Sequence, residues 1–165
     1  MKTFLSLSIL LIILSCSKQP DVLLKTGGTN SGIKKELTIH QSWSGDYPVS
    51  DLNRLPEGQQ ETNAGYIGNN AAFSSVWEVF KPNESVPEAE FTTQLVVFVR
   101  NVTYYNRTSI MKVTLTDGLV EILAMETMAA IPIEGQVAMA IAVIDRAGVR
   151  AIKAGDKIVE VTNVN

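Results

Sequence analysis

The chain has 165 residues, with 14 Lys and Arg against 17 Asp and Glu, and a single His and a single Cys. This length suits one domain with a hydrophobic core. The charge is mildly negative and the basic residues are scattered, so there is no basic stripe of the kind that binds nucleic acid, and we expect no nucleic-acid partner. The lone cysteine cannot form an internal disulfide.

The first sixteen residues have the layout of a bacterial export signal. Lys2 gives a positive start, and the apolar run 4–14 is shorter than the roughly 20 residues that a membrane-spanning helix needs. Its end, Ile13-Leu14-Ser15-Cys16, resembles the lipobox at which a lipoprotein signal is cleaved and the cysteine is acylated. The resemblance implies a signal peptide over residues 1–15 and a lipoprotein anchored through Cys16 in a membrane of the bacterial cell envelope. Secretion or periplasmic release without a lipid, and an uncleaved anchor, are the alternatives.

Residues 16–36 show no hydrophobic period and contain several Gly, Ser and Asn residues. Such a segment behaves as a flexible coil. We therefore expect a tether over residues 16–36 and a β-rich globular domain over residues 37–165.

The first part of that domain contains one helical pattern. Alternation from Leu37 indicates a first strand, and the polar stretch 48–64 is expected to be a long loop. The spacing then predicts a helix over about 70–81, with Asn70 as its N-cap and one apolar face. That face consists of Phe73, Val76, Trp77 and Phe80.

The remainder of the domain has strand patterns. The apolar run 95–99 is typical of a central strand covered on both faces, and Asp117-Gly118 indicates a hairpin with a two-residue turn. The register that this turn sets predicts that Met111 lies opposite Ala124, with both side chains on an apolar face of the hairpin. The segment 137–144 has one alternate face made mainly of alanines, which we expect to pack against the helix. With one or two further strands over 149–161, the predicted fold is α+β: a single small domain with a mostly antiparallel sheet of about six strands packed against one short helix.

Part of this order resembles a known family. A helix ending Val76-Trp77-Glu78-Val79-Phe80 is followed by Val86-Pro87-Glu88-Ala89-Glu90-Phe91, the apolar strand and the hairpin. Over residues 73–125 this resembles the C-terminal domain of the PrcB family of bacterial protease-complex lipoproteins. The family usually has Gly-Gly-Tyr before the next strand, where this chain has Tyr105-Asn106-Arg107-Thr108. The resemblance implies a partner-binding subunit rather than a catalytic one.

Motifs of the common enzyme classes do not occur in the sequence. There is no Gly-x-Ser-x-Gly, no Gly-rich phosphate loop, no Cys-x-x-Cys and no His-Glu-x-x-His. As the only histidine, His40 is the one candidate base, with Asp46 or a nearby acid, for a small envelope enzyme acting on polymer or sugar. A ligand or metal carrier using His40, Met125 and Met128 is a further alternative. We expect no cofactor.

The preferred candidate is a binding surface at one end of the sheet. The hairpin register, extended, places Ser109 opposite Glu126 and Arg107 opposite Met128. Tyr and Arg anchor many protein interfaces, and loops on a rigid sheet often carry binding residues. The sequence therefore predicts a non-catalytic module for an unidentified envelope protein or peptide, and the alternative is an Arg107–Glu126 surface pair of little energetic weight. The candidate binding residues are Arg100, Tyr104, Tyr105, Asn106, Arg107 and Glu126.

Overall fold

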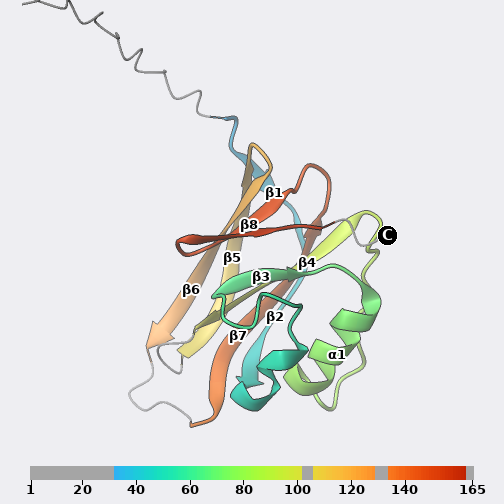
Figure 1. Cartoon of the computed structure of the whole chain (residues 1–165), viewed down its shortest axis with the longest axis vertical. Helices are drawn as coiled ribbons and strands as arrows, with labels where there is room; N and C mark the ends of the chain where they lie inside the picture. Colours follow the sequence, from blue (N-terminus) through green and yellow to red (C-terminus); the bar gives the residue numbers. More distant parts are fainter. Residues whose placement is uncertain (1–31, 102–105, 129–133, 163–165) are drawn as a thin grey trace, which may run out of the picture. The chain divides into compact units, whose positions relative to one another are not determined.

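The computed structural model describes residues 32–101, 106–128 and 134–162. Five strands form sheet A, in the order β1-β5-β6-β8-β9, and four strands form sheet B, in the order β2-β7-β4-β3 (Figure 1). Every strand pair is antiparallel except β6 with β8. In chain order the elements are β1 (Lys35–Leu37), β2 (Ile39–Pro48), the 3₁₀ helix η1 (Val49–Arg54), β3 (Ala64–Ile67), α1 (Asn70–Phe80), β4 (Gln94–Asn101), β5 (Asn106–Thr116), β6 (Leu119–Met128), β7 (Gln136–Asp145), β8 (Ala151–Ala154) and β9 (Lys157–Glu160).

The predicted α+β class, with mostly antiparallel strands and one short α-helix, is confirmed. The strands are divided between two sheets, however, rather than forming one. The division begins at the start of the domain, because β1 pairs with β5 in sheet A while β2, which follows it directly, pairs with β7 in sheet B.

Sheet B is the middle layer of the domain. One of its faces packs against sheet A, through a cluster that includes Val97 and Val113, and its other face packs against α1, through a cluster that includes Val96 and Trp77. The central strands β4 and β7 are therefore covered on both sides. The prediction that 95–99 forms such a strand is confirmed, because every one of these residues is buried.

The two faces of β7 are oriented opposite to the prediction. Met139 and Ile141 belong to the cluster under α1, whereas Ala140 and Ala142 belong to the cluster between the sheets. The expectation that the alanine face packs on the helix is therefore wrong. The physical reason is that the small side chains let sheet A approach β7 closely, while the larger side chains fill the space beneath the aromatic face of the helix.

Helix α1 has the predicted apolar face and a cap one residue earlier than predicted. Phe73, Val76, Trp77 and Phe80 are all buried. The N-cap is Asn69, whose side-chain oxygen accepts a hydrogen bond of 2.8 Å from the amide of Ala72. This bond satisfies one of the backbone amides that the first turn leaves without a partner.

The hairpin turn between β5 and β6 forms where the sequence predicts it. Asp117 and Gly118 have φ values of 49° and 83°, as a type I′ turn requires. Next to the turn, Val113 lies opposite Ile122 and Leu115 opposite Val120, as expected.

Farther from the turn the predicted hairpin register is wrong. A shift between Ile110 and Lys112 places Ile110, not Met111, opposite Ala124. The cause is a β-bulge, which adds one residue to β5 and moves every later pair by one position. Thr108 rather than Ser109 therefore lies opposite Glu126, and Asn106 rather than Arg107 lies opposite Met128. Met111 is 56% exposed, so it does not belong to the core as predicted.

The segment expected to be a long loop contains regular structure. It begins with η1 and ends at β3, whose four residues are all buried. Gly65 is required in β3, because a Cβ there would lie 2.0 Å from Oε1 of Gln59, the atom that accepts a hydrogen bond from the amide of Tyr66.

The predicted anchor and most of the predicted tether lie outside the described residues. Strand β1 starts at Lys35, so the last two residues of the predicted tether belong to sheet A. In the described part of the chain, no helix is long and apolar enough to cross a membrane.

Candidate functional site

The predicted binding residues are only partly brought together. Tyr104 and Tyr105 lie outside the described residues. Asn106 is the first residue of β5, and its backbone pairs with Met128. Arg107 pairs with Thr127 and is exposed. The Thr127 hydroxyl donates a 3.5 Å hydrogen bond to the carbonyl oxygen of Arg107, which holds the two strands together at this end.

Arg100 is bound by the loop before β3 rather than by Glu126. It lies two residues beyond Phe98, and the alternation of a strand directs both side chains to the helix side of sheet B. Its side chain donates a 2.6 Å hydrogen bond from Nε to the carbonyl oxygen of Thr62 and a second bond from Nη2 to that of Gln60. Burial lowers the pKa of the Arg100 guanidinium, and Glu61 and Tyr47 partly offset this effect. The buried side chain of Arg100, which is 4% exposed, therefore holds the loop before β3 in place through these two hydrogen bonds.

The residue that meets Glu126 is Asn101. Its side-chain amide donates a 2.9 Å hydrogen bond to Oε2 of Glu126, which links the end of β4 in sheet B to β6 in sheet A. This role of Asn101 could not be predicted from the sequence, because the two faces of β4 cannot be told apart without the position of sheet A. Beside this bond is a polar cavity of about 280 Å³, whose lining includes Arg100, Asn101, Ile122, Ala124, Glu126 and Lys153. Of the predicted binding residues, Arg100 and Glu126 therefore line one cavity.

The outer face of the β5–β6 hairpin carries three exposed apolar side chains, Met111, Leu123 and Met125, which are 56%, 61% and 51% exposed. We call these three residues the hairpin face. Met111 belongs to it because the bulge turns its side chain outward. Large exposed apolar side chains that lie close together mark interaction sites, and methionine adapts to different partners.

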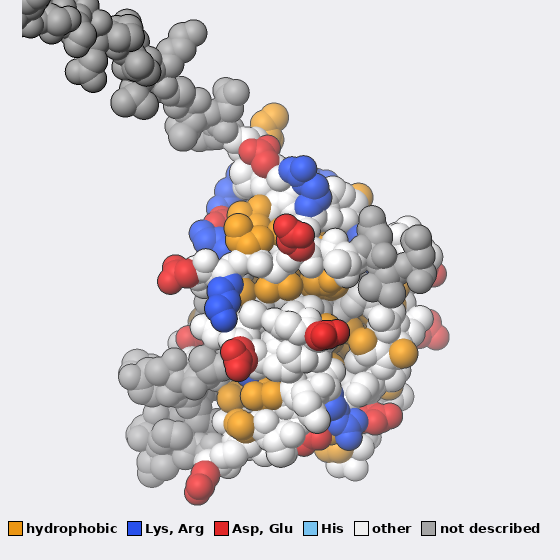
Figure 2. Space-filling view, in the orientation of Figure 1, with side chains coloured by type: hydrophobic (Ala, Val, Ile, Leu, Met, Phe, Trp, Pro, Cys, Tyr) orange, Lys and Arg blue, Asp and Glu red, His pale blue; other side chains and the backbone are white. Residues whose placement is uncertain are grey.

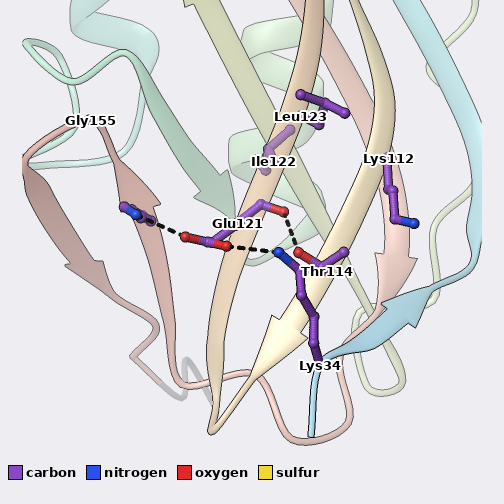
Figure 3. Close-up of a pocket in the computed structure, with 8 residues that line it drawn as sticks. Lys34, Lys112, Thr114, Glu121, Ile122, Leu123 and Gly155 are labelled. Atoms are coloured by element: carbon purple, nitrogen blue, oxygen red, sulfur yellow. Dashed lines mark hydrogen bonds and ion pairs between the residues drawn. The ribbon is translucent and has the colours of Figure 1, made fainter. Parts of the chain in front are cut away.

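Next to the hairpin face is a groove of about 510 Å³ over β5 and β6 (Figure 3). Glu121 lies at its centre, with its carboxylate 3.2 Å from Nζ of Lys34 and 2.8 Å from Nζ of Lys153. The hydrogen bonds from Lys153 and Lys34 lower the pKa of Glu121, and the bond to Glu121 raises the pKa of Lys153. Lys112, on β5, forms a 2.5 Å ion pair with Glu36. These pairs are exposed to solvent, so they contribute little to stability.

Charges of both signs are mixed on the surface. Figure 2 shows apolar patches separated by single acidic and basic side chains, without a broad field of either sign in that view.

His40 pairs with a nearby acid other than Asp46. Its Nε2 lies 2.8 Å from Oδ1 of Asp145, at the end of β7, while Asp46 lies near the other end of β2. Met125 belongs to sheet A and is therefore on a different sheet from His40. Among the described residues, no three His, Cys, Asp or Glu side chains are grouped so that they could hold a metal ion.

Comparison with known proteins adds no family to these observations. No protein-family model matches the chain, and neither the curated proteins nor the solved structures gave a significant match. The resemblance of residues 73–125 to the PrcB family stays a prediction.

We expect replacement of Arg100 by Met to lower the free energy of unfolding by about 1–3 kcal/mol, because the carbonyl groups of Thr62 and Gln60 lose their donor. Arg107→Met, on the exposed surface, should change it by no more than about 0.5 kcal/mol. Urea unfolding of both variants measures the difference. Equal stability of the two variants would show that Arg100 does not fasten the loop.

Proposed function

We propose that this protein is a lipoprotein of the bacterial cell envelope, and that its β-rich domain binds a protein or peptide partner without catalysing a reaction. The anchor rests on the lipobox-like Ile13-Leu14-Ser15-Cys16, with Cys16 as the acylated residue. The binding role rests on the hairpin face and on the absence from the sequence of the common catalytic motifs.

The hairpin face is the observation that carries the binding proposal. Its three side chains come from two paired strands, so the surface is held by a backbone ladder rather than by a loop. Arg107 extends it along β5, and arginine is enriched in protein interfaces. An apolar centre with charged residues at its margin is the composition that partner-binding surfaces usually have.

A second candidate function is catalysis with His40 as a base. The 2.8 Å contact with Asp145 favours it, since a carboxylate beside a histidine can orient the ring. The pair is more than one third exposed, and the side-chain hydrogen bond that the described residues give His40 is to a carboxylate, not to a hydroxyl that could act as a nucleophile. Binding is therefore the better-supported function.

If Cys16 carries the lipid, Cys16→Ser should move the protein from the membrane fraction to the soluble fraction of the envelope, because the sulfur that accepts the lipid is gone. Fractionation followed by immunoblotting measures this. Ser17→Ala is the matched control and should stay with the membrane. A Cys16→Ser protein that remains bound to membranes would contradict acylation at this residue.

For the binding surface, we expect Met111→Lys to reduce recovery of the native partner strongly, because a charge in an apolar contact must lose its water. The measurement is affinity capture of the full-length protein from native envelopes, with quantitative mass spectrometry. Val86→Lys, at an exposed apolar residue outside the hairpin face, is the control and should recover the partner as wild type does.

The triple alanine variant of Tyr104, Tyr105 and Arg107 tests the neighbouring end of the hairpin in the same assay. Loss of the partner in the triple variant, but not in Met111→Lys, would place the binding surface at that end of the hairpin rather than on the hairpin face. Unchanged recovery with both Met111→Lys and the triple variant would contradict the proposed surface.

A further inference from the structure

The methionine side chains that the structure describes differ sharply in exposure. Met111 and Met125 are 56% and 51% exposed, whereas Met139 is fully buried in the cluster under α1. An oxidant attacks a methionine at its sulfur atom, so an exposed thioether reacts and a buried one is protected. Of these side chains, those of Met111 and Met125 are therefore open to oxidation.

The two exposed methionines lie on neighbouring strands of sheet A. Met125, on β6, pairs with Ser109 of β5. Met111 is the extra residue that the β-bulge adds to β5, a short way along the strand from Ser109. Both side chains belong to the hairpin face, so an oxidant reaches them from the same side of the domain.

Sulfur is concentrated on this one surface. Two of the three residues of the hairpin face are methionines, and the third is Leu123. The described part of the chain contains no cysteine, since Cys16 precedes it. Among the side chains that the structure describes, every exposed sulfur atom therefore lies on the hairpin face.

We propose that Met111 and Met125 form a site of reversible oxidation by hydrogen peroxide. The sulfur lone pair attacks one oxygen of the peroxide, so that an S–O bond forms while the O–O bond breaks. The proton on the transferred oxygen passes to the departing hydroxide, which leaves as water. The sulfur is oxidised by two electrons to a sulfoxide, and the peroxide is reduced.

The reverse step needs a dithiol and a methionine sulfoxide reductase, one enzyme for each epimer of the sulfoxide. The sulfoxide oxygen leaves as water, and the two thiols supply the electrons and protons as they join in a disulfide. A reductase must take the side chain into its own active site. The exposure of Met111 and Met125 allows this, whereas the buried side chain of Met139 is out of reach.

Oxidation at this site changes the surface and leaves the core intact. Neither Met111 nor Met125 belongs to the two apolar clusters, so the added oxygen stays in water while the protein is free. In an apolar contact the same polar group must lose its water. The effect on binding rests on the proposed function: oxidation of the hairpin face should release the partner without unfolding the domain.

The first test is limited peroxide treatment of the purified full-length protein, followed by peptide mapping with mass spectrometry. Sulfoxide should form several-fold faster at Met111 and Met125 than at Met139, and the two reductases with a dithiol should remove it. In concentrated urea the three rates should become similar, because the difference comes from the folded structure. Oxidation of Met139 as fast as that of the other two in the folded protein would overturn the proposal, as would sulfoxide that the reductases leave in place.

The second test is affinity capture from solubilised native envelopes, with each purified protein compared before and after peroxide treatment. Oxidised wild type should recover the partner several-fold less than untreated wild type, and the reductases should restore recovery. Met111→Leu/Met125→Leu has an apolar face without sulfur, so its own recovery should be the same before and after peroxide. Met139→Leu is the control and should respond to peroxide as wild type does.

The outcomes separate this inference from the proposed function. Undiminished recovery by oxidised wild type, together with loss of the partner in Met111→Lys, would contradict the inference alone. A loss after peroxide in Met111→Leu/Met125→Leu as large as in wild type would place the sensitive group elsewhere and would also overturn it. Failure of the proposed surface itself is shown by Met111→Lys and the triple alanine variant, which involve no oxidation.

Discussion

The pairing of β4 with β7 is the contact on which the rest of the structure depends. The two strands lie side by side over eight residue pairs, from Gln94 with Asp145 to Asn101 with Ala138. Both faces of this ladder are buried, one under α1 and one under sheet A. Loss of the ladder would separate the helix from the second sheet, because most of the buried side chains that sheet B contributes to the two apolar clusters come from these two strands.

The small residues of β7 determine how the candidate surface is presented. Ala140 and Ala142 allow β5 to approach sheet B, and the inner face of β5 contributes Ile110 and Val113 to the shared cluster. With its inner face packed against sheet B, the β5–β6 hairpin presents its outer face to solvent. Exposure of the hairpin face thus follows from the same packing that stabilises the domain.

Strong local patterns could be predicted from the sequence. The helix was predictable because four large apolar side chains recur at helical spacing, and the hairpin because Asp117-Gly118 suits a turn in which both residues have positive φ. Strand β3 was not predictable, since its four residues, Ala64–Ile67, are too few for a period and include a glycine.

Features that depend on contacts between distant segments could not be predicted. The bulge at Met111 leaves the sequence alternation nearly unchanged, yet it shifts every pair beyond it and turns a predicted core residue outward. The role of Arg100 depends on the carbonyl groups of Thr62 and Gln60, which lie 38 and 40 positions earlier in the chain. For the candidate site, the sequence did not show that Asn101 is the residue that meets Glu126.

The most direct test of this account is amide hydrogen exchange on the full-length protein. The amides of β4 and β7 lie in a ladder that is buried on both faces, so they should be among the last to exchange and should exchange together. The amides of β9, a short strand at the edge of sheet A, should exchange earlier. Exchange of the β4 and β7 amides as fast as those of β9 would contradict the account.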